Sequence, residues 1–513
     1  MNNMVYNKII CFFLLIFLCS ASFMSCNKQL DIASYEIAPE AKHWESISDT
    51  KAGLLGIYGL LRSAMVGNNA HWIYGEVRMG DFQSTGRQDL EAVVENDLRK
   101  SFPLIEDLSN WKRFYAVINA ANLFIERAPE VIKTDSRYTR DNLAIDVSQA
   151  RLIRAFTYFY MVRIWGDVPL ITASFDNSEG FPKFKKTNAT EVLQFAQNEL
   201  MEATEYLPFQ YGVDNQQYYG ELAKTWKNIL FNKSTAYAIM AHIAAWQGKY
   251  IDVDAYTKFI LDNVVVANLQ YNGNLNSTDI GITKLTGITG IFSNAYEPSQ
   301  LFSISGSYTN LEASNTGHFE QLVLAAPFIN KTQPDLYVSR DSITSIFQDL
   351  YDERFGFIAS SGLYNEAYFK NIASLYPVFC KINIIKDGKF AEFGSNLIFT
   401  RLEEIVLLRA EALAAMSRTG EAVVMLNRIK NMRKATPYSI SMEPGRPLMD
   451  EIFKERRKEL LGEGWRCYDL QRFYKLKGNP EKLNQIKSGQ FLWPIAPVVI
   501  KNNSEITQNE YWK

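Results

Sequence analysis

The chain has few of the residues that build metal centres and nucleophilic active sites. Its four histidines are scattered along the chain, and no His-Glu-x-x-His motif occurs. There is no Gly-x-Ser-x-Gly elbow and no phosphate-cradling glycine loop. Residues 272–276 are rich in asparagine and offer oxygen ligands for calcium, but they lack the regular acidic spacing of a calcium-binding loop. We therefore expect neither a cofactor nor a metal centre.

Net charge is also nearly absent. The 54 basic and 56 acidic residues leave a formal charge of −2 at pH 7. Such a chain has no long-range attraction to nucleic acid, so nucleic acid is excluded as an expected partner. Aromatic residues are abundant instead, at 13% of the chain. Tyrosine and tryptophan combine an apolar ring with a polar edge, which suits both core packing and the recognition of sugars or peptides.

The apolar run at the start of the chain is too short to cross a bilayer. Eleven apolar residues follow Lys8, whereas a membrane-spanning helix needs about 20. A basic residue, a short apolar segment and small residues are typical of a secretory signal peptide, predicted here over residues 1–25. The sequence Phe23-Met24-Ser25-Cys26 resembles a bacterial lipobox, which predicts lipidation of Cys26. The alternative is a secreted protein cleaved at Ala21 or Ser25, with Cys26 incidental.

Only two cysteines, Cys380 and Cys467, follow Cys26. They could pair in an oxidising compartment, and the sequence does not decide this. We favour two buried thiols.

Helical patterns dominate both halves of the chain. Residues 48–64, 111–128 and 148–165 have apolar side chains three and four positions apart, which predicts helices. Gly166 and Pro169 end the third of them. Residues 234–246 with 253–263, and 397–416 with 421–434, predict two helical hairpins with small residues near a turn, as in tetratricopeptide repeats. Residues 264–396 are predicted to be loop with short strands, and their aromatic content argues against disorder.

Several of these segments together resemble the SusD/RagB family of outer-membrane lipoproteins. The resemblance is carried by residues 25–31, 49–61 (DTKAGLLGIYGLL), 150–170 (ARLIRAFTYFYMVRIWGDVPL), 402–433, 452–472 (IFKERRKELLGEGWRCYDLQR) and 492–511. It implies that residues 26–513 form one mainly α-helical domain, with about four tetratricopeptide-like helix pairs and a loop-rich, partly β face. It also implies non-catalytic capture of a glycan at the cell surface and its delivery to a SusC-like TonB-dependent transporter.

Candidate ligand contacts come from two regions. Residues 68–87 join two helices and hold an aromatic platform beside charged groups, a combination that suits sugar hydroxyls and ring faces. In the family, this first interhelix stretch and the central segment often supply glycan contacts. The candidates are Trp72, Arg78, Asp81, Tyr296, Tyr308 and Arg354. The competing interpretation is that Trp72 only fastens the loop and Arg354 only forms an ion pair.

Three other functions stay open at this point. A peptide-binding member of the same family would have a site dominated by charged groups. A surface glycoside hydrolase would need two carboxylates roughly 5–10 Å apart in one cleft. The charges of residues 455–469 have helical spacing, and we interpret them as structural ion pairs rather than as such a carboxylate pair. A scaffold that binds only proteins would leave residues 264–396 without a purpose.

Overall fold

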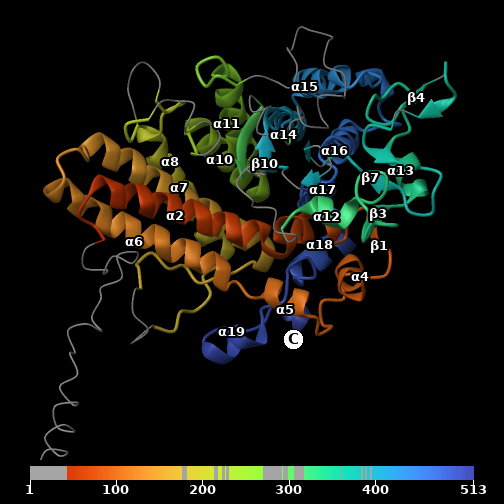
Figure 1. The fold of residues 1–513 in the computed structure, drawn as a ribbon. Helices are drawn as coiled ribbons and strands as arrows, with labels where there is room; N and C mark the ends of the chain where they lie inside the picture. Colours follow the sequence, from red (N-terminus) through yellow and green to blue (C-terminus); the bar gives the residue numbers. More distant parts are fainter. Residues whose placement is uncertain are drawn as a thin grey trace, which may run out of the picture.

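The computed structural model describes most of the chain after its first 42 residues. The described residues are 43–175, 182–212, 218–221, 226, 230–269, 292, 299–304, 317–358, 360–364, 366–382, 385–387, 390–392 and 395–513. Helices dominate this part and the strands are short (Figure 1), which confirms the prediction of a mainly α-helical protein. The predicted signal peptide and Cys26 lie outside the described residues.

Four long helices pack together in one half of the molecule (Figure 1). They are α2 (Ile47–Val66), α6 (Lys112–Thr134), α7 (Arg140–Trp165) and α8 (Ala189–Tyr206). α7 contacts the other three, and every residue from Leu152 to Trp165 is buried. Because neighbours surround this part of α7, it is buried on every side rather than along one apolar stripe. The aromatic run at residues 158–160 therefore belongs to the core, as predicted.

The two predicted hairpins form the centre of the other half. The first is α10 (Lys233–Gln247) with α11 (Tyr250–Asp262), and the second is α14 (Leu402–Ala415) with α15 (Thr419–Met432). α10 begins at an Asn232 capping box and ends at Gly248. Gly248 has a left-handed φ of 75°, a conformation that costs glycine little because it has no Cβ. Buried alanines, among them Ala241, Ala244 and Ala412, let α10, α11 and α14 approach closely. Their classification as tetratricopeptide-like repeats stays a prediction.

The second hairpin begins later than predicted. Residues 397–401 were expected to be helical, but they form strand β10 (Leu397–Arg401), which pairs antiparallel with β2 (Gln300–Ile304). The prediction was wrong here because the pairing partner lies almost a hundred residues earlier in the chain, where no local pattern reveals it. Phe399 of β10 packs edge-on against Phe156 of α7, at 4.9 Å between ring centroids, so the strand pair joins the two halves.

Short elements make up the described part of the central segment, as predicted. Pairs of antiparallel strands are β1 (Phe82–Ser84) with β3 (Leu336–Val338), β4 (Phe357–Ile358) with β5 (Leu363–Tyr364), β6 (Phe369–Lys370) with β7 (Val378–Phe379), and β8 (Ile385–Asp387) with β9 (Phe390–Glu392). Two short helices, α12 (Phe319–Val323) and α13 (Arg340–Ile346), lie among them. Strand β2, introduced above, also lies within this segment.

The C-terminal segment folds back onto the end of α7. It contains α16 (Leu448–Glu459), α17 (Arg466–Lys477), α18 (Pro480–Lys487) and α19 (Pro497–Asn502). The backbone N–H of Trp493 donates to the Ile164 carbonyl at 2.7 Å, and the Asn509 side chain donates to the Trp165 carbonyl at 3.1 Å. α7 ends there because Gly166 has a φ of 75°. A Cβ at Gly166 would lie 2.9 Å from Leu492, so glycine is required for this close approach.

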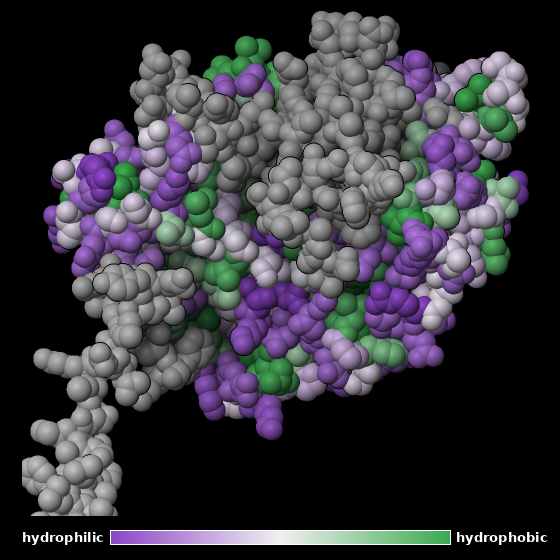
Figure 2. Space-filling view, in the orientation of Figure 1, coloured by the Kyte–Doolittle hydropathy of each residue, from purple (hydrophilic) through white to green (hydrophobic). Residues whose placement is uncertain are grey.

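The visible surface mixes polar and apolar side chains. Figure 2 shows hydrophilic and hydrophobic residues interspersed over the described part of this face rather than one continuous apolar area. Among the described residues, no helix combines the length and the hydropathy that a membrane crossing requires.

The carboxylate of Asp146, a residue of α7, is buried beside residues 218–219. Asp146 accepts hydrogen bonds from the hydroxyl groups of Tyr138, Tyr218 and Tyr219, with 2.9 Å between Tyr138 Oη and Asp146 Oδ2. Burial raises the pKa of Asp146 to about 6, although the three phenol groups oppose the rise. The folded protein therefore binds a proton at Asp146 more tightly than the unfolded chain does.

We predict that Asp146→Asn removes one component of the pH dependence of folding. Because the folded pKa exceeds the unfolded value, the Asp146 contribution is fully present below about pH 4 and is lost as the pH rises through 6. Relative to wild type, the free energy of unfolding of the variant should rise by about 3 kcal/mol between pH 4 and pH 7. Urea unfolding of both proteins across this range measures the difference, and a constant difference would contradict the prediction.

Candidate ligand-binding site

The first interhelix stretch is not the open loop that the sequence suggested. Residues 67–77 form a helical passage made of a 3₁₀ turn, α3 (Ala70–Trp72) and a π-helical turn at Ile73–Val77, followed by β1 and α4 (Gln88–Val94). Trp72 is buried and stacks on Phe319 of α12, with ring centroids 5.5 Å apart and an interplanar angle of 6°. The expectation of an exposed sugar platform is therefore corrected for Trp72, because α12 covers the ring.

The side chains of Arg78 and Asp81 are also buried and bind other parts of the chain. The buried Arg78 guanidinium donates to the carbonyls of residues 490, 491 and 492 at 2.6–2.9 Å, and its Nε donates to Asn96. Asp81 accepts two hydrogen bonds from Arg457 of α16 and lies 3.3 Å from Arg466 Nε. These contacts hold the early part of the chain against the C-terminal segment. They leave neither side chain available to a ligand in this structure.

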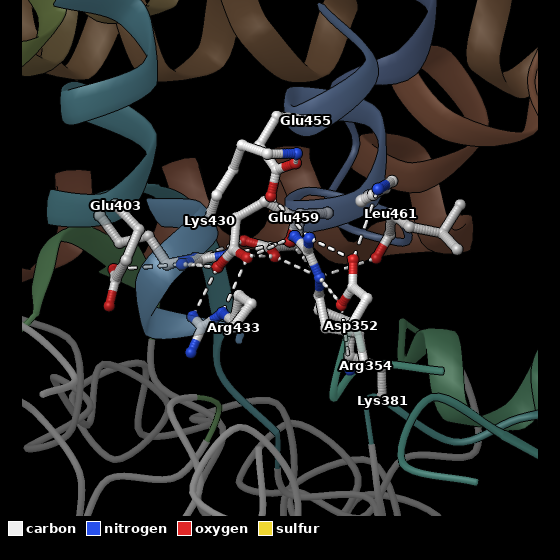
Figure 3. A network of polar contacts seen from close by, with 12 residues as sticks. Asp352, Arg354, Lys381, Glu403, Lys430, Arg433, Glu455, Glu459 and Leu461 are labelled. Atoms are coloured by element: carbon white, nitrogen blue, oxygen red, sulfur yellow. Dashed lines mark hydrogen bonds and ion pairs between the residues drawn. The ribbon is translucent and has the colours of Figure 1, made fainter. Parts of the chain in front are cut away.

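Arg354 lies at the centre of a buried ion-pair network (Figure 3). Its guanidinium forms a fork with Asp352 at 2.8 and 2.7 Å, and donates to Glu455 at 2.6 Å and to Glu459 at 3.0 Å. All four side chains are buried. The expected role of Arg354 as a ligand contact is corrected accordingly, and the competing interpretation of an ion pair describes its surroundings.

Glu459 of α16 accepts hydrogen bonds from three arginine side chains of this network. It accepts from Arg354, from Arg401 of β10 at 2.9 Å, and from Arg433 at 2.9 and 2.7 Å. Burial by itself would raise the pKa of Glu459, but Arg433, Arg401 and Arg354 outweigh it and hold that pKa well below its usual value. Lys381 adds three buried donor contacts, to Glu463 and to the carbonyls of residues 459 and 461.

The network does not have the arrangement that glycoside hydrolysis requires. Its carboxylates are buried and each is paired with arginine or lysine, so no sugar can lie between two of them. Forked pairs of this kind fix the geometry of the segments that carry them. The structural interpretation of the charges at residues 455–469 is confirmed for this conformation.

The remaining predicted positions divide into two groups. Tyr296 and Tyr308 lie outside the described residues. Cys380 and Cys467 are free, buried thiols, as we favoured from the sequence. Burial raises the pKa of Cys380 to about 12, so this thiol is un-ionised and unreactive at neutral pH.

A surface pocket between α5 (Pro103–Ser109), α6 and α19 has the chemistry expected of a sugar site, and we call it the Trp111 pocket. Its volume is about 460 Å³. Two of the elements beside it, α5 and α19, lie in the lower part of Figure 1. Its lining residues are Asn110, Trp111, Lys112, Tyr115, Pro169, Ile171, Pro182, Lys183, Phe184, Val498, Val499, Asn502, Asn503 and Ile506. Aromatic rings, amides and two lysines are present, and none of the lining residues is acidic.

Neighbouring contacts hold the aromatic wall of the Trp111 pocket in place. The Tyr115 hydroxyl donates to the Pro169 carbonyl at 2.7 Å, and Trp111 meets the Tyr115 ring edge-on at 5.8 Å. On the other side, the Asn503 amide donates to the Phe184 carbonyl at 2.9 Å. Because these side chains are held by the fold, little of their freedom has to be lost when a ligand binds.

Sequence reasoning missed the Trp111 pocket because its walls come from three distant parts of the chain. The lining residues within 110–115, 169–171, 182–184 and 498–506 carry no shared motif, and only the fold-back of the C-terminal segment brings them together. The weak local signal was a tryptophan and a tyrosine flanked by asparagine and lysine at residues 110–115.

Comparisons with known proteins agree with this architecture. The model of the SusD family matches residues 391–512, and a model described as "Starch-binding associating with outer membrane" matches residues 105–245. A crystal structure of a SusD superfamily protein from Bacteroides thetaiotaomicron is 45% identical, with a TM-score of 0.83, and the match covers 92% of this chain and 99% of that one. The chain belongs to the SusD family.

More distant SusD-like proteins also match this chain. SusD-like protein P38 of Formosa agariphila is 24% identical over 94% of this chain and 95% of its own length. A laminarin-binding SusD-like protein of known structure is 19% identical, with a TM-score of 0.64, and the match covers 91% of this chain and 99% of that protein.

We predict that Glu459→Gln strongly destabilises the protein. The substitution leaves three buried guanidinium groups without their shared carboxylate, and breaking a buried pair in this way costs about 3–5 kcal/mol. Urea unfolding measures the loss. The matched control is Glu421→Gln, which removes an equally charged group from an exposed pair with Arg418 and should change the unfolding midpoint little. Equal effects of the two substitutions would contradict the prediction.

Proposed function

We propose that this SusD-family chain captures a glycan at the cell surface without catalysis and delivers it to a SusC-like TonB-dependent transporter. Three findings support the proposal: membership of the family, the starch-binding and outer-membrane description of one matching family model, and the laminarin ligand of a structural neighbour. In this proposal residues 1–25 are the signal peptide, Cys26 carries the lipid anchor, and residues 26–513 form one SusD-like domain.

The composition of the Trp111 pocket is the observation that carries the proposal. Tyr115 and Phe184 supply ring faces for the C–H side of a sugar, and Asn502 at the rim supplies an amide for hydroxyl groups. Among the described residues that line the pocket there is no carboxylate pair, which fits binding of a glycan without cleavage. Tyr296 and Tyr308 of the central segment stay candidates for further contacts with the same ligand.

We predict that Tyr115→Ala and Phe184→Ala each weaken glycan binding about tenfold, the effect of losing one stacked ring. The measurement is retardation of the protein without its first 26 residues in native gels that contain neutral and acidic polysaccharides, followed by calorimetry. Tyr206→Ala removes an exposed ring from α8, outside the pocket, and is the control. Thermal unfolding checks that each variant is folded.

The other outcomes are equally specific. Binding that survives both substitutions but is lost in Tyr296→Ala or Tyr308→Ala would move the site to the central segment. Binding of peptides and of no polysaccharide would favour the peptide-binding alternative. Release of reducing sugar during the assay would overturn the non-catalytic function.

We predict that Cys26→Ser releases the full-length protein from the membrane. Without the thiol no acyl chain is attached, and the stabilisation of about 0.8 kcal/mol per buried CH₂ group is lost. Membrane fractionation with metabolic labelling by a fatty acid measures the change. Ser25→Ala is the control, because it alters the same sequence without removing the thiol. Labelling of the serine variant would contradict lipidation at Cys26.

A further inference from the structure

A second cavity lies on another side of the molecule, between the segment after α13, α15 and α16, and we call it the Tyr351 cleft. Its volume is about 620 Å³. These elements lie in the upper right part of Figure 1, away from α5 and α19. The lining residues are Ser345, Ile346, Gln348, Asp349, Leu350, Tyr351, Lys430, Thr436, Arg446, Glu451, Lys454, Glu455, Arg457 and Lys458.

The Tyr351 cleft is lined by charged side chains of both signs. Five lining residues are lysine or arginine and three are acidic, and two of the five cations, Arg457 and Lys458, are paired with Asp81 and Asp352, which do not line the cleft. Asp349, one of the three, accepts from the backbone N–H groups of Tyr351 and Thr436. Glu455, another, is buried and shared by Arg354 at 2.6 Å and Lys430 at 3.5 Å.

Two cations at the mouth of the cleft share one carboxylate. Arg446 and Lys454 both contact Glu451, the latter at 2.9 Å. Arginine and lysine together carry roughly eight N–H donors, whereas one carboxylate has about four acceptor sites. The Arg446–Lys454 pair therefore has more donors than Glu451 can accept, and a second anion can bind there without breaking the existing contacts.

Exposure distinguishes these cations from the buried network beneath them. The side chains of Lys454 and Arg446 are 64% and 48% exposed. Tyr351 and Leu350 are 76% and 59% exposed and line the same cleft. An exposed aromatic ring beside exposed cations suits a sugar ring that carries a negative charge, because the ring face can stack while the charge meets the cations.

The buried network gives the cleft a fixed floor. Lys430 and Glu455 line the cleft and are also members of the network in Figure 3. Arg457, at the side of the cleft, is held by its fork to Asp81. Since these groups are already positioned by the fold, binding of a ligand needs to order only Arg446, Lys454 and Tyr351.

We propose that the Tyr351 cleft binds an anionic substituent of a polysaccharide, a uronic acid carboxylate or a sulfate ester, with Arg446 and Lys454 on the charge and Tyr351 on the sugar ring. The proposal rests on the proposed glycan-binding function and narrows its ligand to acidic polysaccharides. The cleft is separate from the Trp111 pocket, so one long chain can occupy both or each site can be tested alone.

The test is affinity electrophoresis of the protein without its first 26 residues, in gels containing polygalacturonate, carrageenan, laminarin or dextran. We expect retardation by polygalacturonate if the charge recognised is a carboxylate and by carrageenan if it is a sulfate. The double variant Arg446→Gln/Lys454→Gln should weaken this retardation at least about tenfold, and Tyr351→Ala should weaken it too. Raising the salt concentration should weaken binding of the wild type more than binding of the double variant.

The control double variant Lys249→Gln/Lys487→Gln removes the same charge from exposed positions outside the cleft and should bind as wild type does. Equal loss in both double variants would show non-specific charge attraction and overturn the proposal. Binding of laminarin or dextran without binding of either acidic polymer would also overturn it, while leaving the proposed function intact. Absence of binding to every polysaccharide would overturn both.

Discussion

The fold depends on one buried carboxylate. Glu459 of α16 binds three arginines, and each comes from a different part of the chain: Arg354 from the central segment, Arg401 from β10 and Arg433 from the end of α15. None of these groups can be hydrated where it lies, so each is stable only while the others are in place. Correct docking of α16 is thereby linked to correct docking of β10 and of the central segment. The Tyr351 cleft shares Lys430 and Glu455 with this ion-pair network.

Buried aromatic rings and buried ion pairs stabilise the fold in different ways. The aromatic core around α7, with Phe156 and Phe399 in contact, supplies apolar burial, which has little directional preference. The guanidinium forks supply direction, because a planar donor group accepts a carboxylate in only a few orientations. Among the cavities of the described surface, two differ in character. The described lining of the Trp111 pocket is aromatic and contains no acidic residue, whereas the lining of the Tyr351 cleft is rich in charge.

The sequence was sufficient where a residue's role depends on its neighbours along the chain. The periodic run at residues 148–165 predicted α7, and the alanine-rich hairpins predicted α10, α11 and α14. It was insufficient where the role depends on a distant segment. Residues 397–401 become a strand only because β2 is available, and Trp72 is covered only because α12 packs on it. Arg78 has the composition of a binding residue, yet its partners are carbonyls of residues 490–492, which no spacing rule connects to it.

The attachment of Arg78 to residues 490–492 also has a consequence for the order of assembly. The carbonyls that satisfy this buried guanidinium lie within the last 25 residues of the chain, which also supply the contacts at the end of α7. A folding chain can bury Arg78 in this way only once that segment has docked. The same segment also completes the end of α7, so the final packing of the helical half depends on the fold-back of residues 490–509.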